Sequence, residues 1–444
     1  MNMRGIGVKI IEEVYEKEHF LKDVLEGYFH AYEFEQTEKA FLNKLVYGTI
    51  EQQIKIDYII NQFSKTKVDK LKPFIYYVLS MSIYQMLEMT QVPHSAVCNE
   101  AVKLVKKRKL GNLSGYVNGV LRTIGREFKY IKYPEYETDP VQYFSVLYAM
   151  PIWLVSLLMA QYDEETIKKI GEDSLMSPNM TIRHNPLKCT KDELIAELAK
   201  YNLNVKSGEL FDYAFKILGP INLKQLPSFQ DGYFLVQDES SMLASEVLKP
   251  QTGSKVLDLC AAPGGKTTHL AELIGETGTV VARDVSERKI ALINMNIEKL
   301  GFKNIDCQVA DATVYDHTIK EAFDYVLVDA PCSGLGILKK KPDIKRNMNE
   351  ERIESLLIIQ HNILNNAALY VKIGGVLVYS TCTINKQENR AQIDRFLTEH
   401  SDFELQTIEL NHTLSSMQIE DGMLQLLPID DLTDGFFIAK LKKV

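Results

Sequence analysis

The sequence predicts a multidomain protein with an all-α N-terminal domain, a small α+β subdomain and a C-terminal α/β domain of Rossmann-like type. Its 444 residues suffice for about three domains. Apolar residues recur at helical spacing near the N-terminus, whereas short apolar runs alternate with helical stretches from about residue 236 onward. Between these regions helical and extended patterns mix. We therefore expect domains over residues 1–133, 134–235 and 236–444.

The first expected domain has the periodicity of packed helices, with Leu42, Leu45 and Ile50 on one face. The segment 1–130 carries 19 Lys and Arg against 15 Asp and Glu, and the remainder carries 32 against 44. Such a contrast can mark a nucleic-acid contact. The run Lys106-Lys107-Arg108-Lys109 leaves two interpretations open. It is either a solvated helix end favoured by the helix dipole or a patch that contacts phosphate groups.

Prolines at positions 134, 140 and 151 mark the join to the second expected domain. Residues 180–188 are expected to form a strand followed by a turn. In the third domain, residues 287–300 are expected to form a helix that ends at Gly301. Glycine suits that position because it adopts the left-handed conformation without a steric penalty.

Composition and cysteine usage weaken several alternatives. No apolar run reaches 18 residues, and the best candidate, Trp153–Ala160, is too short to span a bilayer. Without an export signal, a cytoplasmic protein is expected. The six cysteines contain no C-x-x-C pair, so zinc and thioredoxin-type chemistry lose support and no metal is expected. Free thiols are the expected state of these cysteines in a reducing compartment.

A turn rich in small residues follows the apolar run Val256–Leu259. It reads Cys260-Ala261-Ala262-Pro263-Gly264-Gly265-Lys266 and opens a predicted helix. Small residues there let the backbone approach a ligand closely. A phosphate-binding P-loop would need glycine six residues before the lysine, where Cys260 stands, and a dinucleotide fingerprint would need a third glycine. Neither phosphate-binding pattern is therefore present.

Two carboxylates strengthen the assignment of this turn to a nucleoside cofactor. Asp284 ends the next apolar run, at the spacing after Gly264 where an acid reaches ribose hydroxyls in nucleotide-binding sheets. Asp311 follows a third predicted strand and could hold an adenine edge. S-adenosylmethionine offers an adenosine but no phosphate, so it fits this combination. The alternative is that both carboxylates only cap strand ends.

Two cysteines follow two further apolar runs. Cys332 lies in Asp329-Ala330-Pro331-Cys332-Ser333-Gly334, and Cys382 lies in Ser380-Thr381-Cys382-Thr383. The carboxyl ends of parallel strands face one crevice, so both thiols are expected beside the cofactor turn. Free cysteines are often only small buried hydrophobes, and that remains the alternative.

A pair of thiols suits chemistry at C5 of a pyrimidine. A thiolate that adds at C6 makes C5 nucleophilic enough to attack an electrophilic methyl group. Asp329 could hydrogen-bond the N3/N4 edge of cytosine, and Lys266 could orient the same base. The residues alone leave open which cysteine attacks. The basic stretch Lys339–Arg346 follows closely and is expected to grip phosphate groups near the reacting base.

Motifs along nearly the whole chain resemble those of one family, the bacterial small-subunit rRNA cytosine-C5 methyltransferases with a NusB-like N-terminal domain (the RsmB/Sun/Fmu family). The resembling segments are Val92–Ala101, Tyr116–Arg122, Gln237–Ser241, Cys260–Lys266, Asp329–Gly334, Ser380–Thr383 and Gly435–Phe437. The middle segment, with Arg183 and Asn185, is similar to the family's small RNA-binding subdomain. One departure is Ile429, where relatives often have histidine.

The resemblance implies a class I methyltransferase domain that methylates a cytosine-967-type site in 16S rRNA. It implies that Cys382 is the nucleophile and that Cys332 helps to release the product. It also implies cofactor contacts from residues 260–266, Asp284, Asp311 and Asp329. The expected partner is 16S rRNA, without a membrane or metal, and the protein is expected to be a monomer. The alternatives are methylation of tRNA or another RNA, and a non-catalytic RNA-binding or antitermination factor.

Overall fold

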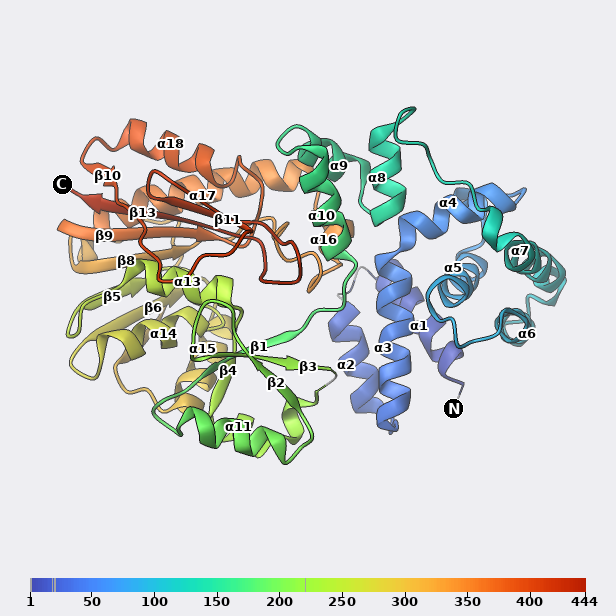
Figure 1. Cartoon of the computed structure of the whole chain (residues 1–444), viewed down its shortest axis with the longest axis horizontal. Coiled ribbons are helices and arrows are strands. Elements are labelled where there is room, and N and C mark those ends of the chain that lie inside the picture. The colour runs from blue at the N-terminus through green and yellow to red at the C-terminus, as the bar shows by residue number, and fades with distance from the viewer. Residues whose placement is uncertain (1, 18, 20, 220) are drawn as a thin grey trace. The chain divides into compact units, whose positions relative to one another are not determined.

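The computed structural model describes residues 2–17, 19, 21–219 and 221–444 (Figure 1). The chain forms two compact units. The first contains Met1–Gly171 and the short segment Lys341–Asn347, and the second contains Glu172–Lys340 and Met348–Val444. A short stretch that follows the Cys332 loop therefore packs as part of the first unit.

The described residues of the first unit form helices and no strand, as the sequence predicts. Its α-helices are α1 (Met3–Glu16), α2 (Leu21–Ala31), α3 (Gln36–Glu51), α4 (Gln53–Phe63), α5 (Pro73–Glu88), α6 (His94–Lys107), α7 (Ser114–Glu127), α8 (Pro140–Tyr148), α9 (Ile152–Met159), the start of α10 (Glu164–Ser174) and α16 (Ile344–Asn347). Short 3-10 turns lie at η1 (Val68–Lys70), η2 (Gly111–Leu113) and η3 (Phe128–Tyr130).

Close packing around α5 organises the core of this helical unit. The helix begins at Pro73, whose fixed φ and missing amide hydrogen are tolerated in a first turn. Gly48 of α3 lies against Tyr84 of α5, and a Cβ at position 48 would overlap the tyrosine ring. Only glycine therefore allows these two helices to approach at this point.

The second unit begins with a small antiparallel sheet of order β2-β3-β1-β4. Its elements are β1 (Met180–His184), α11 (Lys191–Ala199), β2 (Asn204–Ser207), β3 (Ala214–Leu218), η4 (Leu223–Gln225), α12 (Pro227–Gln230) and β4 (Phe234–Val236). The strand predicted from residue 180 is β1. Helix α11 starts with a reciprocal cap, in which Thr190 and Glu193 each bind the other's backbone amide.

A large mixed sheet follows, with strand order β11-β12-β13-β9-β8-β5-β6-β7, and β10 pairs with β13. Its strands are β5 (Lys255–Asp258), β6 (Thr279–Asp284), β7 (Ile305–Val309), β8 (Phe323–Asp329), β9 (Val371–Thr381), β10 (Phe403–Leu405), β11 (Met417–Glu420), β12 (Met423–Leu426) and β13 (Phe436–Lys443). Strands β5 to β9 run parallel, and β13 lies antiparallel beside β9. This is the predicted α/β architecture with an antiparallel edge.

Helices cover both faces of the large sheet (Figure 1). Residues along β8 alternate between two cores: Val326 and Val328 pack with the side of α17 (Glu350–Tyr370) and α18 (Arg390–Glu399). Leu327 packs with α13 (Glu239–Leu248) and α14 (Gly265–Ile274). The alternation follows from the two-residue period of a strand. A strand buried on both faces carries its polar, reactive residues at its ends.

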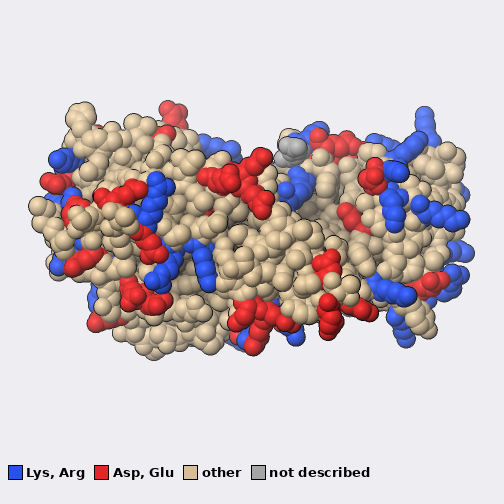
Figure 2. All heavy atoms as spheres, turned by 90° about the horizontal axis from the view of Figure 1, so that it is seen from above, with Lys and Arg blue, Asp and Glu red and all other residues tan. Residues whose placement is uncertain are grey.

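Helix α15 (Glu287–Leu300) has the bounds that the sequence predicts and ends at Gly301, which has φ +88°. Within the described ranges, no single helix is long and apolar enough to cross a membrane, although α8 and α9 pass that test together as a bent pair. Figure 2 shows Lys and Arg interspersed with Asp and Glu over one face, without one continuous basic surface.

Candidate active site

Three neighbouring parallel strands bring the cofactor turn and the two cysteines together at the carboxyl end of the large sheet. Strand β5 lies between β6 and β8, and β8 lies between β5 and β9. The cofactor turn leaves β5, the Cys332 loop leaves β8, and Cys382 follows β9. The paired register, with Asp329 opposite Ser380, aligns the carboxyl ends of β8 and β9. Segments distant in sequence therefore meet at the carboxyl ends of these strands.

The two predicted cysteines lie next to each other. Their Sγ atoms are 3.3 Å apart, and both side chains are partly exposed. A backbone hydrogen bond of 3.1 Å from Gly336 N to the carbonyl oxygen of Cys382 joins the two loops again. The hydrogen bond to Cys382, together with burial, raises the pKa of Cys332 well above its ordinary value.

The cofactor turn has the backbone conformation that its glycines permit. Gly264 caps α14 with φ +99°, and a Cβ there would lie 3.2 Å from Cγ2 of Ile293. Asp284, which is buried at the end of β6, accepts hydrogen bonds from the backbone N–H of Ala262 at 2.9 Å and of Val285 at 2.7 Å. Its carboxylate thus links the turn to the neighbouring strand.

A second carboxylate, Asp258, lies fully buried at the end of β5. Thr267 Oγ1 donates a hydrogen bond to its Oδ2 at 2.7 Å, whereas its Oδ1 has no hydrogen-bond partner. Burial raises the pKa of Asp258 to about 7. Sequence reasoning missed this residue, although its place at a strand end directly before the turn was a usable signal.

These residues fit S-adenosylmethionine. Gly264 lets the turn pack closely against Ile293 of α15, Asp284 stands where ribose hydroxyls bind in such sheets, and Asp258 offers an unsatisfied acceptor. Asp329 and Asp284 also repel the Asp258 carboxylate and so contribute, after burial, to its raised pKa. A cationic sulfonium group would relieve that repulsion.

Asp329 and Lys266 form a direct ion pair beside the thiols. Lys266 Nζ lies 2.7 Å from Asp329 Oδ2, and Ser380 Oγ donates to Asp329 Oδ1 at 2.9 Å. The lysine side chain is 12% exposed and the aspartate side chain is 28% exposed, so both are partly accessible to solvent. Ser380 belongs to the strand that leads to Cys382, which ties the acid to both cysteine strands.

Asp311 lies apart from this buried set. It is exposed after β7, and its Oδ1 accepts hydrogen bonds from the backbone N–H and hydroxyl of Thr313. The remaining turn residues, Ala261 and Pro263 to Gly265, form the link from β5 to α14. Pro263 is the exposed member of that link.

The two residues singled out in the small RNA-binding subdomain are buried. Arg183 is 2% exposed and donates to Gln237 Oε1, the Gly265 carbonyl oxygen and Thr268 Oγ1. Asn185 is 3% exposed and donates to the carbonyl oxygens of Gly232 and Leu300. Both side chains therefore hold the small sheet against the large one instead of facing solvent.

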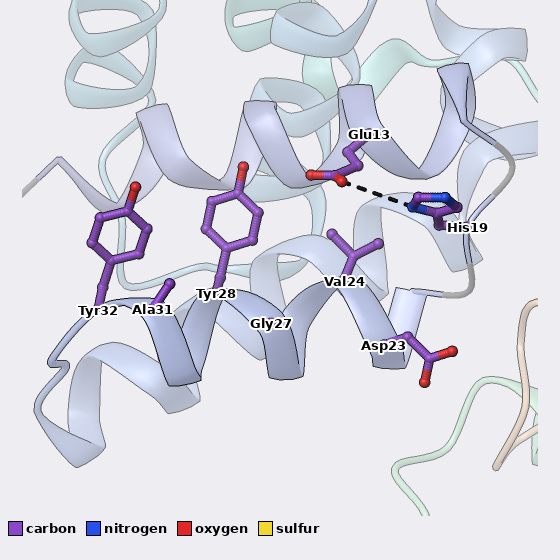
Figure 3. Close-up of a pocket in the computed structure, with 8 residues that line it drawn as sticks. All are labelled: Glu13, His19, Asp23, Val24, Gly27, Tyr28, Ala31 and Tyr32. Atoms are coloured by element: carbon purple, nitrogen blue, oxygen red, sulfur yellow. Dashed lines mark ion pairs between the residues drawn. The ribbon is translucent and has the colours of Figure 1, made fainter.

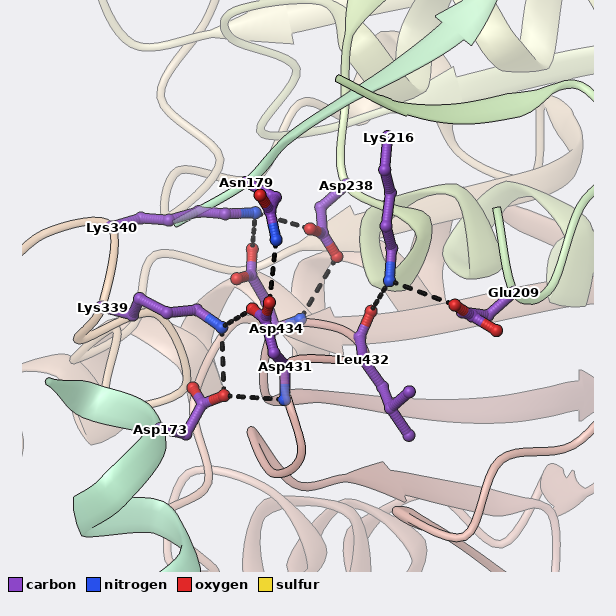
Figure 4. Close-up of polar contacts among 10 residues, drawn as sticks. All are labelled: Asp173, Asn179, Glu209, Lys216, Asp238, Lys339, Lys340, Asp431, Leu432 and Asp434. Atoms are coloured by element: carbon purple, nitrogen blue, oxygen red, sulfur yellow. Dashed lines mark hydrogen bonds and ion pairs between the residues drawn. The ribbon is translucent and has the colours of Figure 1, made fainter. Parts of the chain in front are cut away.

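The prediction that the basic stretch Lys339–Arg346 grips phosphates is wrong for the lysines at 339 and 340, which pair with acidic side chains (Figure 4), and for the buried lysine at 345. Lys339 pairs with Asp173 and Asp431, and Lys340 pairs with Asp238 and Asp434. Lys345 is 7% exposed and donates to the Tyr148 carbonyl oxygen within the helical unit. Acidic partners distant in sequence neutralise Lys339 and Lys340, although the local sequence suggests an exposed basic segment.

A surface hollow of about 390 Å³ lies elsewhere, between α1 and α2 of the helical unit (Figure 3). Glu13, His19, Tyr28 and Tyr32 are among its lining residues. None of the predicted site residues contributes to it. This hollow therefore does not mark the chemistry of the protein.

Comparisons with known proteins agree with this architecture. The NusB family matches residues 1–126, the RsmF/B-like ferredoxin-like domain matches residues 150–224, and the 16S rRNA methyltransferase RsmB/F family matches residues 245–442. The "Probable ribosomal RNA small subunit methyltransferase B" of Bacillus subtilis is 36% identical over 100% of this chain and 99% of its own length.

Two solved structures are similar as well. The crystal structure of PH0851 matches with a TM-score of 0.80 and 28% identity over 100% of this chain and 99% of that one. NSun6 from Pyrococcus horikoshii, solved with the S-adenosylmethionine analogue SFG, matches with a TM-score of 0.61 and 25% identity over 67% of this chain and 99% of that one. The chain therefore belongs to the 16S rRNA methyltransferase RsmB/F family and is an S-adenosylmethionine-dependent RNA methyltransferase.

Proposed function

We propose that the protein methylates C5 of a cytosine in 16S rRNA, at a cytosine-967-type site, through a covalent bond between Cys382 and C6 of the base. The observation that carries this proposal is the 3.3 Å distance between the Cys332 and Cys382 sulfurs at neighbouring strand ends. The name of the Bacillus subtilis relative supports rRNA as the substrate. Methylation would then take place in the cytoplasm, where that RNA lies.

Cys382 starts the reaction as the nucleophile. Its thiolate adds to C6 of cytosine and breaks the C5–C6 double bond, which leaves C5 electron-rich. S-adenosylmethionine, when bound at the glycine turn, supplies the electrophilic methyl group.

Release of the product needs loss of the C5 proton and cleavage of the C6–sulfur bond. We assign Cys332, as a thiolate, to accept the C5 proton, because its sulfur lies 3.3 Å from that of Cys382. The electrons of the C5–H bond then re-form the C5–C6 double bond and expel the Cys382 thiolate. Asp329 and Lys266, joined at 2.7 Å, stand where they can bind the N3/N4 edge of the base and stabilise charge that develops there. Asp284, Asp311 and the turn Cys260–Lys266 are assigned to the cofactor.

The RNA must present its target base outside a stack, because a duplex would bury the reacting carbon atoms. We propose that the helical domain, residues 1–133, and the subdomain within residues 134–235 select that RNA. Lys106 and Lys107 remain candidates for phosphate contacts because they are exposed in the last turn of α6.

Two variants test the assignment of the thiols. Cys382→Ala is expected to abolish methyl transfer, and substantial remaining activity would refute its role as nucleophile. Cys332→Ala is expected to trap a covalent RNA–protein adduct on denaturing gels. Absence of any adduct would contradict the release role. Mapping of 5-methylcytosine in rRNA and tRNA, with and without the gene, distinguishes the proposed substrate from another RNA.

A further inference from the structure

A buried carboxylate joins the two cysteine loops. Glu388 lies in the turn between β9 and α18, shortly after Cys382, and its side chain has no exposed surface. An ionised carboxylate accepts hydrogen bonds and donates none. Its removal from water is costly unless donors surround it, so the identity of those donors indicates what the group does.

Donors from both loops converge on Glu388. Its Oε1 accepts hydrogen bonds from Ser333 N at 2.8 Å and from Gln360 Nε2 at 3.0 Å. Its Oε2 accepts from the Ser333 hydroxyl, from Asn385 Nδ2 at 3.1 Å and from Thr383 Oγ1 at 3.4 Å. All four donor residues are at most 2% exposed.

Two of these donors hold equivalent places in the two loops. Ser333 follows Cys332 directly, and Thr383 follows Cys382 directly. Their hydroxyl oxygens lie 2.8 Å apart. Each hydroxyl has a single hydrogen, so with Ser333 donating to Glu388 the Thr383 hydroxyl donates either to Ser333 Oγ or, at 3.4 Å, to Glu388 itself. Asn389 adds a bond of 3.0 Å from its Nδ2 to the Thr383 carbonyl oxygen. The backbone directly beyond each thiol is thereby fixed to the same carboxylate.

We propose that Glu388 is a positioning residue that sets the separation of the Cys332 and Cys382 sulfurs. This inference rests on the proposed function, in which the two sulfurs act in turn on adjacent ring carbons. Glu388 touches neither sulfur through any of the hydrogen bonds described and acts through Ser333 and Thr383. Misplacement of a reacting group by about 1 Å can lower a rate roughly 10²-fold, so the clamp bears directly on turnover.

The test compares three variants of the full-length protein. Thr383→Val removes the hydroxyl without changing the size of the side chain, and Thr383→Ser keeps the hydroxyl as a matched control. Glu388→Gln places an amide NH₂ among groups that already donate. The affinity of each variant for S-adenosylmethionine, measured by calorimetry, shows whether the second unit is folded.

Two measurements follow the thiols themselves. Phenylarsine oxide forms two As–S bonds with a close pair of thiols and releases one water, so its affinity reports their separation without RNA. Cys332→Ala gives the baseline for capture by single thiols. Methyl transfer in a single turnover with saturating RNA and cofactor then isolates the chemical step from binding.

Thr383→Val is expected to lower the affinity for phenylarsine oxide at least tenfold and the single-turnover rate about 10²-fold. Its affinities for RNA and S-adenosylmethionine are expected to stay within about twofold, and Thr383→Ser is expected to behave as wild type. Glu388→Gln is expected to show the same loss. If Glu388→Gln fails to bind the cofactor, the result for Thr383→Val alone decides whether the proposal holds.

If Thr383→Val binds phenylarsine oxide as tightly as the wild-type protein does, the proposal is overturned, even if the methylation rate falls. Equal losses in Thr383→Val and Thr383→Ser also overturn it, since the retained hydroxyl would then not matter. If the wild-type protein methylates no cytosine while Thr383→Val still loses arsenical capture, the proposed function fails. The positioning of the thiols by Glu388 stands in that case.

Discussion

Replacement of Asp434 by asparagine is expected to stabilise the second unit relative to wild type, and increasingly so as the pH rises from 5 to 7. Asp434 shares Lys340 with Asp238, and its side chain is 9% exposed (Figure 4). Burial and repulsion from Asp238 raise the pKa of Asp434 from 3.8 to about 7. The unfolded chain therefore releases this proton at lower pH than the folded protein does.

The sign and size of the effect follow from that difference. Between pH 3.8 and pH 7 the folded state binds more protons at Asp434, so this group's contribution to stability falls as the pH rises. The difference between a pKa of 3.8 and one of about 7 corresponds to about 4 kcal/mol once the pH exceeds 7. Roughly a third of that loss is already present at pH 5. Asparagine cannot ionise, so the variant escapes the remaining loss of about 3 kcal/mol.

Scanning calorimetry between pH 5 and pH 8 measures this gap. The transition of the second unit is the one that shifts when S-adenosylmethionine is added. At about 2 °C per kcal/mol, the Tm difference between Asp434→Asn and wild type is expected to widen by roughly 6 °C. Comparison of the two proteins at each pH cancels the titration of all other groups.

Asp238→Asn is the matched control with the opposite sign. Burial would raise the pKa of Asp238, but attraction to Lys340 outweighs it and lowers the pKa to about 2. Its contribution, about 2 kcal/mol, is lost only as the pH falls below 3.8 toward 2, so this variant is expected to be less stable than wild type at pH 5. The deficit is expected to narrow as the pH rises, because loss of the Asp238 charge also lowers the pKa of Asp434. A gap for Asp434→Asn that stays constant, or narrows with rising pH, would refute the reasoning.

Four further substitutions probe the cofactor side. Gly264→Ala adds a Cβ 3.2 Å from Ile293 at φ +99°, so it is expected to distort the turn and to raise the Kd for S-adenosylmethionine at least tenfold in calorimetry; an unchanged Kd would contradict this role of Gly264. Asp284→Asn leaves one acceptor oxygen for the two N–H groups of Ala262 and Val285 and is expected to weaken binding about 10- to 100-fold. Lys289→Met, which removes the 2.9 Å ion-pair partner of Asp284, should stay within about threefold, and equal effects would assign the role to the ion pair. Arg183→Met loses its hydrogen bonds to Gly265 and Thr268 and leaves Glu272 without this cation. The second unit should therefore lose about 3 kcal/mol of stability, and its Tm should fall by about 6 °C. A Tm shift below about 1 °C would show that these contacts contribute nothing.

Local signals account for the elements that the sequence predicted well. Helix α15 could be bounded because its apolar spacing and its glycine cap, Gly301, belong to one short continuous segment. The cofactor turn and both cysteines could be placed at strand ends because buried parallel strands read as short apolar runs. Their meeting in one crevice then followed from the rule that the carboxyl ends of such strands share an edge.

Long-range partners explain the errors and omissions. The lysines at 339 and 340 read as a surface run because no local feature reveals Asp173, Asp431, Asp238 or Asp434 as their partners. Arg183 was assigned to an RNA-binding segment, yet its acceptors lie in distant parts of the chain. Glu388 was overlooked because its role depends on Ser333, which belongs to another loop far earlier in the chain.

The amino-acid sequence by itself determined the order of helices and strands, the turn for the cofactor and the two thiols, because hydrophobic period and glycine placement act over a few residues. Only the tertiary structure decided which charges are buried, which side chains pair, and how far apart the two sulfurs lie. Those properties depend on groups brought together by the packing of distant segments. Desolvation and hydrogen bonding act on that spatial neighbourhood, which the linear spacing of residues does not encode.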